Sequence, residues 1–152
     1  MLLSDLTDIN LINANLNSNT KREVIEEMVD MFEKFGIITE RDNFIEAVLN
    51  REKECTTGFG KGIAIPHGKS DSVKKSCFAI GKCKGVQWDS LDGQPVELVI
   101  LIAVPKSKAS TEHLFIISRL AEELMDDRFT NKLKNASSNQ EIFEILEGIG
   151  IN

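Results

Sequence analysis

A nearly uninterrupted apolar run, Val96–Val104 (VELVILIAV), limits the possible folds more than any other segment of the chain. A strand with one face in water alternates apolar and polar side chains, whereas a strand covered on both faces is apolar along its length. The run therefore predicts a central strand with packing partners on both sides. Pro105 follows the run and is expected to end the strand, because proline has no amide hydrogen to donate.

Shorter strand and helix patterns surround this run. Alternation of apolar and polar residues predicts a further strand at 11–16, and short segments rich in apolar residues predict strands at 63–65, 77–83 and 86–88. Capping residues and apolar spacing predict four helices: from Thr20 to Gly36, from Thr39 to about Arg51, from Ser110 or Thr111 to near Asp127, and after Ser138. Because strands and helices interleave without long linkers, we expect an α/β fold. This would be a single-domain sandwich spanning residues 3–150, with a mixed central sheet flanked by helices on both faces.

Composition excludes several classes of protein. The 152 residues carry a net charge of −6, which gives little support to a role in binding nucleic acid. No apolar run approaches about 18 residues, so no membrane span is expected, and any membrane connection would be indirect, through a partner. Three cysteines (Cys55, Cys77, Cys83) without a C-x-x-C pair indicate reduced thiols and a cytoplasmic location.

The segment 56–70 (TTGFGKGIAIPHGKS) contains the first candidate site residue, His67. The strand 63–65 is expected to stop at Pro66, which would leave the imidazole exposed at a strand end, next to Gly68. Chemistry in α/β folds is concentrated at strand ends, so His67 is a candidate phosphoryl acceptor or general base. The alternative is a loop histidine that hydrogen-bonds to its own turn.

His113 and Arg51 are the other candidates. His113 is expected in the first turn of a helix, where free N–H groups and partial positive charge attract phosphate and favour a neutral ring. Arg51 is expected at a helix end shortly before the glycine-rich segment, and its guanidinium matches phosphate oxygens. Taken singly, each is also compatible with an ordinary surface position.

Other motifs are incomplete. Gly68-Lys69-Ser70 resembles the end of a P-loop, but Ile63 occupies the position of the required glycine. The glycines at 58, 60 and 62 do not match the dinucleotide fingerprint, and the histidines and cysteines lack zinc spacing. The residues alone therefore match none of these motifs, and the family resemblance described next implies no metal and no organic cofactor.

Taken together, these residues resemble a known family. The stretch Glu52–Gly68, above all GxGIAIPHG around His67, resembles the phosphorylation-site signature of fructose/mannitol-type (type-2) EIIA domains of the bacterial phosphotransferase system. Leu91–Val96 (LDGQPV) with the apolar run behind it, and Glu112–Leu114 (EHL), are also similar to that family. The similarity covers nearly the whole chain.

The resemblance implies an order of events. HPr, charged by Enzyme I from phosphoenolpyruvate, would donate a phosphoryl group to His67. His113 and Arg51 would stabilise it, and a cysteine of a IIB partner would then accept it for sugar uptake. The membrane IIC component would be reached only indirectly. Fructose is the commonest sugar of the family, with mannitol and galactitol left open.

Two other interpretations remain open at this point. The nitrogen-related branch of the same family has the same histidine but acts by phosphorylation-dependent binding of other proteins, and the HPG motif does not separate the two branches. An unrelated nucleotide-binding fold, with the glycine-rich segment around a phosphate, is the third interpretation.

Overall fold

The computed structural model describes residues 2–108, 111 and 114–150, and its centre is the strand predicted from the apolar run. Within the described residues the sheet has six strands in the order β1-β5-β6-β3-β2, and β4 also pairs with β6. The strands are β1 (Ile12–Asn13), β2 (Gly58–Gly60), β3 (Ile63–Ala64), β4 (His67–Ser70), β5 (Cys77–Val86) and β6 (Val96–Pro105).

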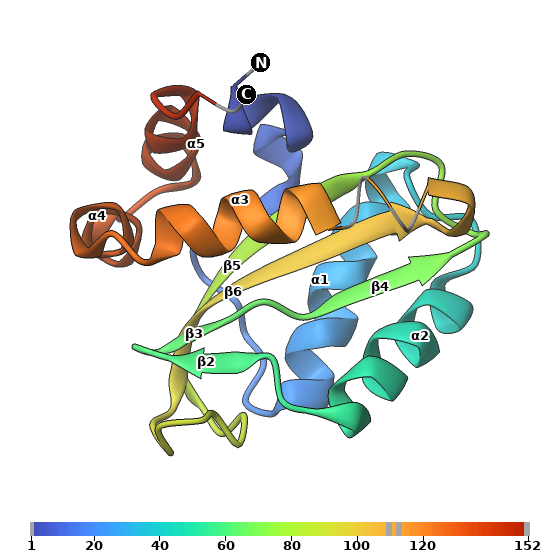
Figure 1. Cartoon of the computed structure of the whole chain (residues 1–152), viewed down its shortest axis with the longest axis horizontal. Coiled ribbons are helices and arrows are strands. Elements are labelled where there is room, and N and C mark those ends of the chain that lie inside the picture. Colours follow the sequence, from blue (N-terminus) through green and yellow to red (C-terminus); the bar gives the residue numbers. More distant parts are fainter. Residues whose placement is uncertain (1, 109–110, 112–113, 151–152) are drawn as a thin grey trace.

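The helices in the same part of the chain are α1 (Lys21–Phe35), α2 (Arg41–Glu54), α3 (Leu114–Leu124), α4 (Asp127–Asn135) and α5 (Asn139–Glu147). Short 3₁₀ helices lie at Leu3–Leu6, Ile9–Leu11 and Lys106–Lys108. None of these helices is long and apolar enough to cross a membrane. The amide of Leu3 donates to the carbonyl of Ile149 at 2.8 Å, so the two ends of the described chain lie side by side (Figure 1).

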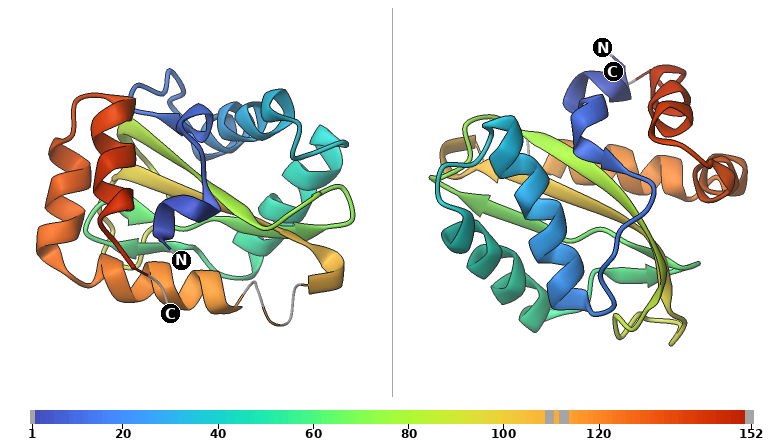
Figure 2. Two further views of the ribbon diagram at one scale, coloured as in Figure 1. Left: turned by 90° about the horizontal axis from the view of Figure 1, so that it is seen from above. Right: turned by 180° about the vertical axis from the view of Figure 1, so that it is seen from behind.

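The sheet is mixed, as predicted. β6 runs antiparallel to β5 and parallel to both β3 and β4. Along β6, Val99, Leu101 and Ala103 belong to a core with side chains of α1 and α2. The alternating residues of β6 belong to a second core, with side chains of α3, α4 and α5. Helices therefore cover both faces of the sheet, which confirms the predicted α/β architecture (Figures 1 and 2).

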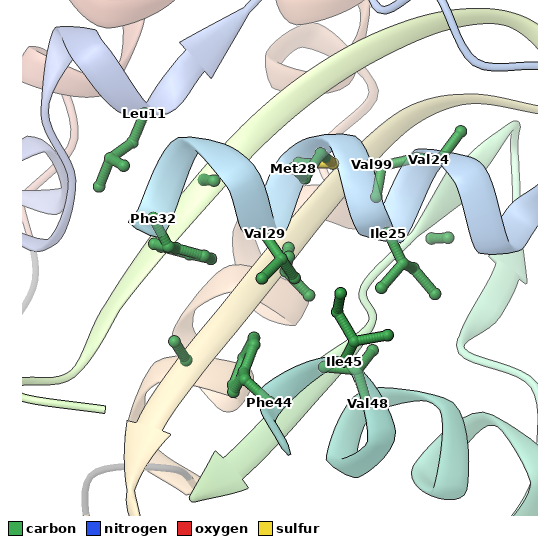
Figure 3. Close-up of a cluster of buried hydrophobic side chains, with 14 of the residues drawn as sticks. Leu11, Val24, Ile25, Met28, Val29, Phe32, Phe44, Ile45, Val48 and Val99 are labelled. Carbon is green, nitrogen blue, oxygen red and sulfur yellow. The ribbon is translucent and has the colours of Figure 1, made fainter. Parts of the chain in front are cut away.

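Figure 3 shows the first of these cores, in which α1 and α2 pack on each other as well as on the sheet. The rings of Phe32 and Phe44 meet edge to face, with centroids 6.1 Å apart and planes at 82°. Both side chains are fully buried, and so is Val48 on α2. Burial of this kind fixes α2 against the sheet, and α2 supplies one wall of the site described below.

Three predicted helix boundaries are confirmed by their capping bonds. The side chains of Thr20 and Ser138 accept from the backbone amides of Glu23 and Glu141, and Gly36 takes the left-handed conformation that ends α1. These bonds satisfy backbone groups that a helix end leaves unpaired.

Other boundaries were predicted wrongly. The cap of α2 is Glu40 and not Thr39, and α2 continues past Arg51 to Glu54. The strand predicted at 11–16 is confined to β1, and residues 86–88 form no separate strand because Val86 is the last residue of β5. Helix α4 was not predicted. The proposed capping residue Ser110 lies outside the described residues.

Candidate functional site

His67 is the first residue of β4, where its backbone is aligned with Ile102 of β6. β3 and β4 pair with the same edge of β6, β3 near its start and β4 near its end, and Ile65 and Pro66 separate them. The predicted end of the strand at Pro66 is therefore confirmed, but pairing with β6 resumes at His67 in a second strand. The carbonyl of Pro66 accepts from the amide of Ile102 at 3.0 Å, since proline loses a donor but keeps its acceptor.

The glycine-rich segment directly precedes β3, as predicted. Gly60 and Gly62, both with positive φ, form the tight connection of the β2–β3 hairpin. Gly68 has a different role, because a β-carbon there would lie 2.9 Å from Cγ2 of Val48. Only a residue without a side chain lets α2 approach β4 this closely. His67 is consequently half-buried beside α2, and not exposed in a glycine-lined turn.

The imidazole of His67 contacts the backbone of the residues just before it in the chain. Nδ1 lies 3.0 Å from the carbonyl oxygen of Ile65. A carbonyl oxygen can only accept, so Nδ1 carries the hydrogen, and the neutral ring then has its lone pair on Nε2. This tautomer makes Nε2 the nucleophilic atom of the ring.

Burial lowers the pKa of His67 below its ordinary value of 6.5, and the nearby positive charge of Arg51 lowers it further. The hydrogen bond to Ile65 and the negative charges of Glu52 and Glu54 act in the opposite direction, but burial is the largest effect. The ring is therefore neutral at neutral pH, as a nucleophile must be.

Arg51 lies in the last turn of α2, and one guanidinium nitrogen (Nη1) donates to the carbonyl of Cys55 at 2.7 Å. Arg51 and His67 line the same pocket, which has a volume of about 430 Å³. Two of the three predicted site residues are thus brought together from α2 and β4. The third, His113, lies outside the described residues.

The prediction missed three further polar residues of this pocket, Asn50, Glu54 and Lys69. Their spacing in the sequence could have identified them as neighbours of Arg51 and His67. Ala47, Asn50, Arg51 and Glu54 recur at the three- and four-residue intervals of one helix face, and Lys69 is two residues from His67 on the same face of a strand. Within the described ranges, no cluster of histidine, cysteine and carboxylate side chains has the composition to hold a metal ion.

Fold and site together define a class of protein. This α/β protein has a neutral histidine from its sheet and a guanidinium from a helix in one pocket, a pair suited to accepting an anionic group. The chain belongs to the EIIA 2 family of the phosphoenolpyruvate-dependent sugar phosphotransferase system, whose model matches residues 5–149.

Relatives in this family are named either as sugar-specific components or as nitrogen regulatory proteins. The chain is 41% identical to the PTS system fructose-specific EIIABC component of Bacillus subtilis, over 96% of this chain but only 23% of that protein. It is 36% identical to the fructose-specific EIIA component of Haloferax volcanii, covering 95% of this chain and 94% of the relative. It is also 33% identical to a nitrogen regulatory protein of Bradyrhizobium diazoefficiens, over 96% and 95%.

Similar solved structures likewise include a nitrogen regulatory protein and a sugar-specific IIA protein. The nitrogen regulatory protein IIA-Ntr of Neisseria meningitidis superimposes with a TM-score of 0.86 at 30% identity, over 95% of this chain and 98% of that one. The IIA mannitol enzyme of Escherichia coli, solved in a complex with phosphorylated IIB, gives a TM-score of 0.79 at 27% identity, over 93% and 97%.

Proposed function

We propose that this protein is a phosphocarrier, and that Nε2 of His67 accepts a phosphoryl group from the phosphohistidine of HPr and passes it on. The observation that carries the proposal is the contact between Nδ1 of His67 and the carbonyl of Ile65. It holds the ring in the tautomer whose Nε2 is nucleophilic, on a strand that fixes the direction of attack.

The transfer exchanges one P–N bond for another. The lone pair of Nε2 attacks phosphorus in line, the P–N bond of the donor breaks, and its electron pair returns to the imidazole of HPr. The ring of His67 keeps the hydrogen on Nδ1, and the carbonyl of Ile65 stabilises the positive charge that the ring gains. In the second transfer a cysteine thiolate of IIB attacks phosphorus and forms a P–S bond, the P–Nε2 bond breaks, and its electron pair returns to the neutral ring of His67.

Arg51 is proposed to neutralise the phosphoryl oxygens, because its guanidinium lines the same pocket as the acceptor. The same role is proposed for His113 on the resemblance alone. The pocket also contains Lys69 and Asn50, which add a positive charge and an amide donor. No step requires a metal or an organic cofactor.

The physiological role is proposed to be sugar uptake of the fructose type, through IIB and, indirectly, membrane IIC. The named relatives with the highest identity are fructose-specific, and one structural relative was solved with phosphorylated IIB. We further propose that residues 3–150 constitute one EIIA domain. Because the chain spans 23% of the Bacillus subtilis relative, the IIB and IIC partners are part of the proposal and not of the comparison.

The test is reconstitution of the relay with phosphoenolpyruvate, Enzyme I and HPr. The wild-type protein should gain one acid-labile phosphate by intact-mass spectrometry, and His67→Ala should gain none. A phosphorylated His67→Ala protein would contradict the assignment of the acceptor, and an unphosphorylated wild type would contradict the function.

A regulatory role is the alternative, and the overlap with the nitrogen regulatory protein of Neisseria meningitidis favours it. Phosphorylated protein should be mixed with the fructose-type IIB and the sugar-dependent loss of phosphate measured. Rapid loss together with restored fructose uptake supports transport. A phosphate that IIB does not remove supports the regulatory role.

A further inference from the structure

A buried carboxylate lies behind the proposed acceptor, outside the pocket. Glu52, at the end of α2, is 8% exposed and its side chain only 4%. Isolated charges are costly to bury, so a buried carboxylate needs donors around it. Nζ of Lys21, on α1, lies 3.2 Å from Oε2 of Glu52. Thr57 supplies two further donors to this carboxylate, and one of them is its backbone amide, at 3.3 Å. The hydroxyl of Thr57 is the other.

Thr57 links Glu52 to the backbone next to the proposed acceptor, His67. Its side chain and amide are held by Glu52, and its carbonyl accepts from the amide of Ile65 at 3.1 Å. The next group in the chain is the carbonyl of Ile65, which is in contact with Nδ1 of His67. Three successive sets of hydrogen bonds, joined through the backbones of Thr57 and Ile65, therefore connect Glu52 to the imidazole.

The position of Ile65 makes this anchor necessary. Ile65 lies between β3 and β4, so the β6 ladder does not hold its peptide as it holds Ala64 and His67. In the described structure its amide is held by Thr57. If Thr57 moved, the carbonyl of Ile65 would lose its orientation towards Nδ1.

We propose that Glu52 is a positioning residue that fixes the tautomer of His67 through Thr57 and Ile65, with Lys21 as its charge partner. Glu52 does not line the pocket, so its proposed effect on the acceptor is indirect. This inference rests on the proposed function for its catalytic consequence, but the tautomer is a property of the unphosphorylated protein and can be measured alone.

The only tryptophan of the chain, Trp88, lies next to Lys21 of this network. Its ring lies 5.4 Å from Nζ of Lys21, and its carbonyl accepts from the hydroxyl of Thr56 at 3.1 Å. Trp88 is fully buried, and its ring is placed for a cation–π contact with the ammonium that pairs with Glu52.

The experiment compares Glu52→Ala and Glu52→Gln with the wild type. Glutamine retains an oxygen for the amide of Thr57 and a donor for its hydroxyl, so it keeps the geometry without the charge. Glu46→Ala is the control, since Glu46 is an exposed carboxylate on the same helix. Long-range ¹H–¹⁵N spectra identify the protonated ring nitrogen, with His67→Ala assigning the signals.

We expect the Nδ1–H tautomer in the wild type, Glu52→Gln and Glu46→Ala. In Glu52→Ala the fraction of Nε2–H should rise, and phosphoryl acceptance from HPr should slow by roughly ten- to hundredfold, as small misplacements of reacting groups do. A folded Glu52→Ala protein with the wild-type tautomer overturns the inference. So does Glu52→Gln if it loses the tautomer as Glu52→Ala does.

If Glu52→Ala does not fold, as judged by its amide spectrum, Thr57→Val and Thr57→Ser provide the same test. Valine removes the hydroxyl bond to Glu52 and should shift the tautomer, whereas serine keeps that bond and should not. Equal tautomers in these two proteins would overturn the inference. If the wild type accepts no phosphate, the proposed function fails, yet the tautomer comparison still decides the role of Glu52.

Discussion

Gly68 and Val48 lie so close that a β-carbon on Gly68 would come within 2.9 Å of Cγ2 of Val48 and 3.1 Å of Cε1 of Phe44. These contacts fix the separation of α2 and β4, and therefore the separation of the two walls of the pocket. The spacing of Arg51 and His67 is thus set by a residue that has no side chain.

Gly68→Ala should push α2 away from β4. Overpacking of a tight core contact costs about 1–3 kcal/mol, so we expect a loss of that size in the free energy of unfolding. Phosphoryl acceptance should fall as well, because the two walls separate. Urea denaturation and the reconstituted relay measure the two effects. Gly148→Ala is the control, since a β-carbon there meets only an ordinary contact at 3.5 Å, and it should change neither quantity.

Replacement of Arg51 should reduce acceptance by about a hundredfold in Arg51→Ala, the usual effect of losing one charge-stabilising donor. Arg51→Lys should recover only part of this, because an ammonium lacks the planar guanidinium fork. The lost charge should also raise the pKa of His67 and move the acid limb of its rate–pH profile to higher pH. Arg22→Ala, an exposed arginine on α1, should leave both unchanged.

Stability should depend on pH through His67. Burial places the pKa of the folded ring below 6.5, so between these values the unfolded chain binds more protons than the folded one. The stabilising contribution is complete above pH 6.5 and is lost as the pH falls towards the folded pKa. Denaturation at stepped pH should show this decline, and His67→Gln should show less of it. Identical slopes in the two proteins would contradict the assignment.

Thiol reactivity should separate the three cysteines. Burial raises the pKa of Cys77 to about 12 and that of Cys83 to about 11, whereas Cys55 is exposed. Since the thiolate is the reactive form, the native protein should react with one equivalent of a thiol reagent and the denatured protein with three. Peptide mapping should place the native label on Cys55. Rapid native labelling of Cys77 would contradict its burial.

The sheet was predictable because its central strand is buried on both sides. In β6 each residue from Leu98 to Val104 belongs to one core or the other, so the apolar run alone indicates two covering layers. The caps at Thr20 and Ser138 were predictable for a similar reason, since the bonds that form them are local.

Helix α4 was missed because its stability depends on distant contacts. Its nine residues contain only two large apolar side chains, Phe129 and Leu133, and both become buried against the second core. A short polar segment of this kind carries too weak a pattern, since tertiary packing and not intrinsic propensity holds it helical.

The sequence pointed to Arg51 and His67, which line one pocket, but not to the other polar residues of that pocket or to its arrangement. The proline at 66 indicated that the strand ends there, but parallel pairing with β6 resumes at once, because Pro66 still accepts from Ile102. Arg51 and His67 share a pocket because the β2–β3 hairpin returns the chain to α2. The number of residues between Arg51 and His67 in the sequence does not indicate how close the two lie in the fold.

The interrupted edge of β6 has a consequence for recognition. A residue on a mobile loop must be ordered whenever a partner arrives, and that loss of conformational freedom weakens binding. The backbone of His67 is already ordered by its pairing with Ile102, so an incoming protein needs to supply no energy for this. If the proposed function holds, the same ordered backbone would be presented both to the phosphoryl donor and to the phosphoryl acceptor.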